Sequence, residues 1–113
     1  RLKHLVHLVL VFAERNPGLC CVLTGDALMG ENASLRKRAS QFFERLETQV
    51  RQALKEGEIR QGLRPRTSAA RGADFIMVFV EGRIQRFVRL SFARAPSGDF
   101  EEAWALIAEG TWG

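Results

Sequence analysis

Six consecutive apolar residues, Phe75 to Val80, lie inside a segment whose pattern is otherwise helical. Successive residues of a helix are about 100° apart around its axis, so such a run points in every direction. A helix that is apolar on all sides has to be buried on all sides. A chain of 113 residues has few other helices with which to surround it. We therefore expect a second copy of the chain to cover part of this helix.

The apolar periodicity predicts an all-α chain of about five helices in a single domain, residues 1–113, without a convincing strand. Proline and glycine mark the expected breaks: Pro17 follows the first helix, Gly57 caps the third and Pro96 follows the fourth. A linker is expected over residues 57–66. The expected helices cover residues 2–14, 17–23, 34–56, 67 or 68 to 92, and 99 onwards.

Three helix starts carry capping signals. Asn16 is expected to accept a free backbone N–H of the second helix, with Pro17 at the first helical position. Thr67 or Ser68 is expected to begin the fourth helix. Asp99 and Glu102 have the spacing of a capping box, which predicts the start of the fifth helix.

The last two helices are expected to be long and antiparallel, joined by a short turn. Because one of them is too apolar for a monomer, the pair is expected to form half of a dimeric four-helix bundle. Gly72 and Gly82 each cost about 1 kcal/mol relative to alanine inside a helix, which close approach to another helix would offset. The expected dimer interface comprises Gly72, Phe75, Ile76, Phe79, Gly82, Arg83, Phe87, Trp104 and Ile107.

On the first expected helix, Leu8 and Val11 fall in or beside the polar sector, next to Arg15. Two interpretations stay open. Scattered apolar residues are common on protein surfaces and need no function. Alternatively, the spot receives a peptide with an aliphatic side chain and a carboxylate, because a guanidinium binds a carboxylate bidentately. The core-facing residues of this helix are expected to be Leu5, Val6, Val9, Phe12 and Ala13.

Other candidate sites are weaker. His4 and His7 have a spacing at which two imidazoles can share a metal ion, but no carboxylate or cysteine partner is evident, so no metal is expected. The adjacent Cys20 and Cys21 are the only cysteines. They cannot build a disulfide framework, and we expect small core residues in a reducing cytoplasm rather than a redox pair.

The composition excludes few partners and the motifs indicate no catalysis. A net charge of +4 is typical of nucleic-acid-binding domains and also of ordinary protein surfaces. No apolar run approaches the roughly 20 residues of a membrane span, so no membrane partner is expected. A glycine-rich phosphate loop, a nucleophile elbow and a helical HExxH motif are all absent from the sequence, and neither an enzyme nor a cofactor is expected.

The order of these patterns resembles the C-terminal half of a TetR-family regulator. "GEIRQGLRPRTSAARGADF" resembles the loop before the dimerising helices of that family, and "NPGL" its short connecting helix. Five blocks resemble more closely one branch of the family, the nucleoid occlusion factors, and the most specific is "ERNPGL" followed by "LTGDALM". The blocks are "LVLVFAERNPGL", "LTGDALM", "FERLETQVRQAL", "EGRIQRFVRLSF" and "DFEEAWALIA".

The resemblance implies a homodimeric, cytoplasmic, nucleoid-associated protein that binds DNA and inhibits assembly of the division ring over the chromosome. Its implied protein partner is the C-terminal tail of the division GTPase FtsZ, held by Leu8, Val11, Arg15 and Asn16. Val11 stands where the branch has a small, glycine-like residue, which implies a narrower groove. The family's DNA-binding helix-turn-helix is expected in a segment preceding Arg1. The alternative is a small-ligand-sensing domain of a TetR-type repressor, which requires an internal cavity of several hundred Å3.

Overall fold

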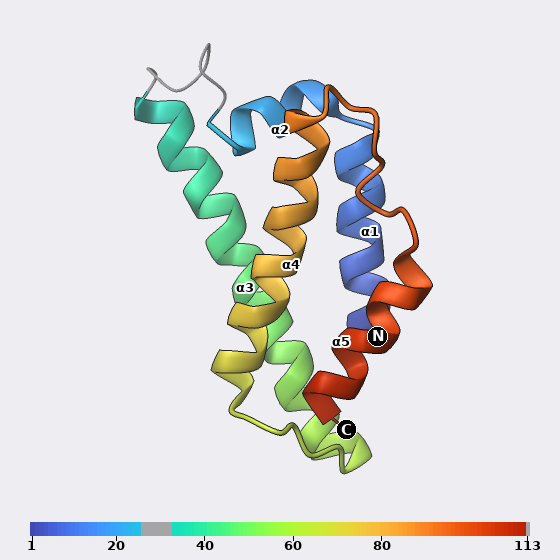
Figure 1. The fold of residues 1–113 in the computed structure, drawn as a ribbon. Coiled ribbons are helices and arrows are strands. Elements are labelled where there is room, and N and C mark those ends of the chain that lie inside the picture. Colours follow the sequence, from blue (N-terminus) through green and yellow to red (C-terminus); the bar gives the residue numbers. More distant parts are fainter. Residues whose placement is uncertain (26–32, 113) are drawn as a thin grey trace.

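The computed structural model describes residues 1–25 and 33–112. This part of the chain contains five α-helices and no strand, as the periodicity predicts (Figure 1). The last four residues of the "LTGDALM" block, 26–29, lie outside the described residues. The helices are α1 (Leu2–Glu14), α2 (Pro17–Leu23), α3 (Ala33–Gln61), α4 (Ala69–Arg89) and α5 (Phe100–Trp112).

The predicted bounds of α3 and α4 are wrong at their C-terminal ends. Gly57 is not a cap, because α3 continues through it to Gln61, and Gly62 follows with a φ of +67°. The helix therefore stops where a residue adopts the left-handed conformation that glycine tolerates best. Helix α4 ends at Arg89, before residue 92, and Ser91 and Phe92 have positive φ values of 55° and 66°. The longest helix is α3, with 29 residues, whereas α5 has only 13.

The capping predictions have mixed outcomes. Ser68 caps α4, since its side chain accepts a hydrogen bond from the backbone N–H of Arg71. Asn16 lies at the N-cap position of α2, but its side chain makes no cap bond and Nδ2 donates to the carbonyl of Phe12 at 2.8 Å instead. The capping box at Asp99 does not form, because its φ of +52° is far from the extended backbone of such a cap.

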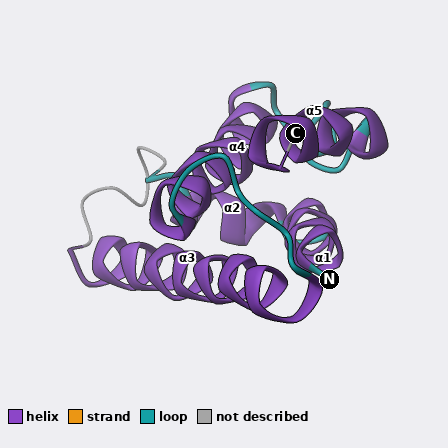
Figure 2. Cartoon of the chain, turned by 90° about the horizontal axis from the view of Figure 1, so that it is seen from below, coloured by secondary structure: helices purple, strands orange, loops and turns teal. Residues whose placement is uncertain are grey.

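The helices form two groups around one core. Figure 2 shows α1 and α3 on one side and α4 and α5 on the other, while α2 crosses the end of the bundle where α1 stops. Among the described residues, the largest fully buried side chains come from α1, α2, α3, α4 and the loop before α5. They are Val6, Leu10, Cys20, Val50, Leu54, Ile76, Met77, Val80, Ile84 and Pro96.

The connection from α4 to α5 is held in place from two helices. Arg83 Nη1 donates to the carbonyl oxygens of Pro96 at 3.0 Å and Gly98 at 2.6 Å. Glu14 Oε1, at the end of α1, accepts from the backbone N–H and the hydroxyl of Ser97, at 3.1 and 2.5 Å. These bonds fix the direction in which α5 leaves the loop.

In the described part of the chain, no single helix combines the length and apolar character of a membrane span. Only α1 and α2 taken together have the length and the apolar composition of such a span, and the chain bends by 106° between them.

Candidate functional site

The outward face of α1 carries a larger apolar surface than the sequence predicts. Leu8 is 51% exposed and Phe12, one turn further on, is 50% exposed. Phe12 was expected in the core, and this prediction is wrong. It lies only about 40° from Leu8 around the helix axis, so it shares the exposed side. Val11, half-buried, lies beside them.

Arg15 is an exposed residue at the end of this apolar face. Neither ion pair of the described residues involves it. The neighbouring carboxylate, that of Glu14, already accepts two hydrogen bonds from Ser97. Asn16 uses its Nδ2 on the carbonyl of Phe12, which leaves the amide oxygen as an acceptor. Leu8, Val11 and Arg15 thus lie on one side of α1, from its middle to its C-terminal cap, and Asn16 follows directly.

A groove between α1 and α3 continues from this face. One hollow of about 540 Å3 is lined by His4, Leu5, Leu8, Gln49 and Gln52, among others. A neighbouring hollow of about 420 Å3 shares Leu5 and Gln49 with the first and extends to Arg38, Phe42 and Arg45. Sequence reasoning missed the two arginines at this groove. Their spacing of seven residues, two helical turns, is the signal that puts both on one side of α3.

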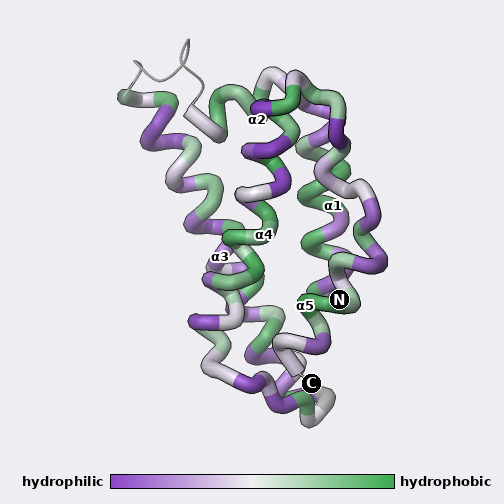
Figure 3. The backbone as a smooth tube through the Cα atoms, in the orientation of Figure 1, coloured by the Kyte–Doolittle hydropathy of each residue, from purple (hydrophilic) through white to green (hydrophobic). Residues whose placement is uncertain are grey.

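A second exposed apolar surface runs along α4. Phe75 is 58% exposed and Val78 is 64% exposed, Phe79 is half-buried, and Gly82 is open to solvent. A Cβ added at Gly82 would meet no heavy atom within 4 Å. The four positions follow the i, i+3, i+4, i+7 spacing of a helical stripe. The hydropathy colouring in Figure 3 shows this apolar stretch in the middle of α4.

The other side of α4 is covered by the chain itself. Ile76 and Phe87 are buried, as are Trp104 and Ile107 of α5. Gly72 is buried too, and a Cβ there would lie 3.1 Å from Leu54 Cδ1 of α3, so its close approach is to a helix of the same chain. These five residues, which were expected at a dimer interface, are buried within the single chain, whereas Phe75, Phe79 and Gly82 of the expected set lie on the stripe.

Arg83 also acts within the chain. Besides its two bonds to the α4–α5 connection, its guanidinium carbon lies 4.9 Å from the centre of the Phe79 ring. The pKa of Glu81, on the same helix, is raised mainly by burial and to a smaller extent by the nearby carboxylates of Glu47 and Asp74.

The histidines and cysteines do not assemble into a site. The His7 ring packs 4.8 Å from that of Phe100, and His4 lines the groove described above. Cys20 is buried, and its Sγ donates to the carbonyl of Ala13 at 3.2 Å. Burial, with a smaller effect of Cys21, raises the pKa of Cys20 to about 11. Within residues 1–25 and 33–112, no group of three or more ligating side chains could hold a metal ion.

The five-helix, strand-free fold of the described residues agrees with the C-terminal domain of a tetracyclin repressor-like protein. A family model of this description, the SlmA-like C-terminal domain, matches residues 1–110, and the chain belongs to this family.

Three relatives show how similar the chain is to individual members. It is 83% identical, over all 113 residues, to the nucleoid occlusion factor SlmA of Marinobacter nauticus, of which it covers 58%. It is 47% identical to the SlmA of Colwellia psychrerythraea over 95% of the chain and 54% of that protein. It is 47% identical to the SlmA of Vibrio campbellii over 96% of the chain and 55% of that protein. The chain spans little more than half the length of these relatives.

Proposed function

We propose that this chain is the dimerisation and partner-binding domain of a DNA-binding nucleoid occlusion factor, a protein that inhibits assembly of the division ring over the chromosome. The names of the relatives support this role. The observation that carries it furthest is the exposed apolar face of α1 with a free arginine at its end. The names of the relatives do not favour the alternative, a ligand-sensing transcriptional repressor.

The proposed partner at α1 is the C-terminal tail of FtsZ, a peptide. An aliphatic side chain of the tail packs against Leu8 and Val11, and Phe12 enlarges the surface available to it. Arg15 binds a carboxylate of the tail, for which its fork of N–H donors is suited. The free amide oxygen of Asn16 accepts a backbone N–H. The site acts by binding alone, without a cofactor.

The proposed homodimer forms through the exposed stripe of α4, together with Leu106 of α5, which is also exposed. A contiguous apolar stripe of this kind is typical of a protein–protein interface. The dimer carries two copies of the α1 face, so two FtsZ tails joined in one polymer bind with an avidity that a single tail lacks. DNA is proposed to bind to a part of the protein outside this chain, which would place the dimer on the nucleoid.

The charge reversal Arg15→Asp in the full-length protein tests the tail site. We expect at least a tenfold loss of affinity for an FtsZ tail peptide in a calorimetric titration, because an attractive charged hydrogen bond becomes a repulsion. The sedimentation of the dimer should not change.

Arg64→Asp is the matched control, since Arg64 is exposed and belongs to the connection from α3 to α4. Figure 1 shows this connection at the opposite end of the bundle from α2. It should bind the peptide like the wild type. Equal affinity of the Arg15 variant and the wild type would remove Arg15 from the site.

A further inference from the structure

The exposed stripe of α4 begins at a cation. Arg71 is exposed and lies about one turn before Phe75 and two turns before Val78, within about 40° of both around the helix axis. The carboxylates of the same helix, Asp74 and Glu81, are turned by about 60–80° from Arg71. The apolar stripe therefore carries a positive charge at its N-terminal end.

The outward side of α5 ends at an anion. Glu102, Ala105, Leu106 and Glu109 are all exposed and follow the i, i+3, i+4, i+7 spacing of one helical face. The buried residues of α5 lie on the opposite face. Leu106 is 74% exposed, and Glu109 follows it by almost one turn. This face therefore has an apolar middle with a negative charge at its C-terminal end.

The charges of Arg71 and Glu109 are not explained by their own helices. Arg71 lies in the first turn of α4 and Glu109 in the last turn of α5. The helix dipole disfavours a cation at the N-terminus and an anion at the C-terminus. Arg89 and Glu102, at the other ends of the two helices, have the favoured signs. Neither ion pair of the described residues involves Arg71 or Glu109.

The two faces belong to one outward surface, because α4 and α5 lie on the same side of the molecule, away from α1 and α3 (Figure 2). A two-fold dimer needs a surface that is complementary to itself. This surface meets that condition, since it has apolar residues beside a cation on α4 and apolar residues beside an anion on α5.

We propose that Arg71 of one copy pairs with Glu109 of the second copy, and that this pair, formed twice in the dimer, selects the chain's own copy as partner. A chain with a similar apolar stripe but other charges would bring like charges together at these contacts, which costs affinity. The inference rests on the homodimer of the proposed function and adds the charges that choose the partner.

Two charge reversals in the full-length protein test the pair. The homodimer of the Arg71→Glu variant has two carboxylates facing each other at both contacts, and that of the Glu109→Arg variant has two cations. We expect each variant to dimerise about tenfold more weakly than the wild type in sedimentation equilibrium. In the mixed dimer of the two variants, opposite charges meet at both contacts. An equimolar mixture should therefore dimerise to within about threefold of the wild type.

Arg89→Glu is the matched control, since Arg89 is exposed on the same line of α4, about five turns further on. Its mixture with the Glu109→Arg variant should contain no more dimer than the two variants form separately. A rescue as large as that by Arg71→Glu would show that net charge alone joins the chains, which contradicts the proposed pair.

The same experiment separates the pair from the dimer itself. A dimeric wild type whose two variants dimerise equally well, or a mixture of them without rescue, overturns the pair and leaves the proposed dimer intact. A monomeric wild type overturns both.

Discussion

Arg83 joins α4 to the α4–α5 connection through one side chain. It donates to two carbonyl oxygens of the α4–α5 connection and lies over the ring of Phe79. The connection contains three residues with positive φ, Ser91, Phe92 and Asp99, a conformation that side chains rarely adopt without support. The sequence placed Arg83 at the partner interface because of its position on α4. It could not show these bonds, since they depend on how the loop folds back.

Arg83→Gln should therefore destabilise the fold. We expect the free energy of unfolding to fall by about 1–3 kcal/mol, because charge-assisted bonds to the loop carbonyls are lost. Urea unfolding followed by circular dichroism measures it. Arg86→Gln removes the same charge from an exposed position one turn away and should change stability little. Equal stability of the two variants would contradict the role of Arg83.

The two adjacent cysteines differ in their surroundings, which makes their reactivity a test of the core. Burial raises the pKa of Cys20 from its ordinary value of 9.0 to about 11, whereas Cys21 is only half-buried. At pH 8 a thiol reagent should label Cys21 first and Cys20 only on unfolding. Between pH 9 and about 11 the unfolded thiol ionises and the folded one does not, so the free energy of unfolding should fall as the pH rises.

Labelling of Cys21→Ala at pH 8 isolates Cys20. The native variant should react only at the rate of its unfolding. Rapid labelling would show that Cys20 is accessible, contrary to the core described above.

At the scale of helices, sequence patterns predicted which segments are helical more reliably than which way each residue faces. The run from Phe75 to Val80 was expected to be buried on all sides, and the single chain buries Ile76, Met77 and Val80. Only the packing of α3 and α1 decides that Ile76 faces the chain's own core and Val78 faces out. Phe12 illustrates the same limit on α1. At about 40° from Leu8 it lies at the boundary of the apolar face. The position of neighbouring helices, which periodicity does not contain, decides its burial.

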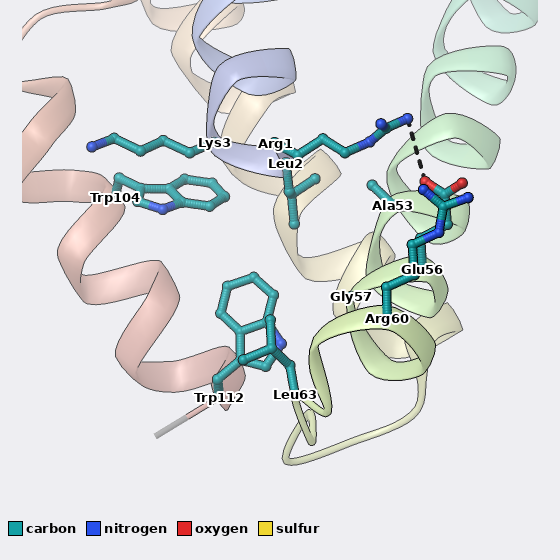
Figure 4. Close-up of a pocket in the computed structure, with 10 residues that line it drawn as sticks. All are labelled: Arg1, Leu2, Lys3, Ala53, Glu56, Gly57, Arg60, Leu63, Trp104 and Trp112. Carbon is teal, nitrogen blue, oxygen red and sulfur yellow. Dashed lines mark ion pairs between the residues drawn. The ribbon is translucent and has the colours of Figure 1, made fainter.

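The end of α3 shows a limit of local signals. Gly57 and Gly62 are both possible terminators by residue type. Packing of Leu63 on Gly57 requires the helix to continue beyond it, and the positive φ occurs at Gly62. A hollow of about 390 Å3 at this end, lined by Leu2, Gly57 and Trp104 among others (Figure 4), could not be predicted, because it joins residues from α1, α3 and α5 that are distant in sequence.

Gly82→Leu tests the stripe of α4 as a helix-packing surface. The single chain has room for the side chain, and leucine favours the helix, so the monomer should keep its fold. In the dimer, leucine would fill space that a partner helix needs, and we expect at least tenfold weaker dimerisation, a cost typical of overpacking. Sedimentation equilibrium measures the change. Gly18→Leu in α2, also open to solvent, is the control, and equal dimerisation of the two variants would place Gly82 outside the interface.

At the scale of the whole molecule, the two exposed surfaces have separate roles in the proposed function. In the proposed assembly the α4 stripe would face a second copy and the exposed face of α1 a peptide, so the dimer would present two peptide sites. Family membership comes from the match over residues 1–110, and no single motif of the chain would have established it. The proposed activity depends on the dimer, because avidity requires both sites on one particle.

Sedimentation equilibrium of the full-length protein and its Val78→Asp variant is therefore the most direct test. An aspartate in the middle of the stripe would bury an unpaired charge in the interface and leave the exposed surface of a monomer unharmed. The control is Ile59→Asp, because Ile59 is 83% exposed on α3, away from the stripe. We predict that the wild type and the Ile59 variant are dimers and that the Val78 variant is a folded monomer. A monomeric wild type, or a Val78 variant that dimerises as tightly as the wild type, would contradict this account.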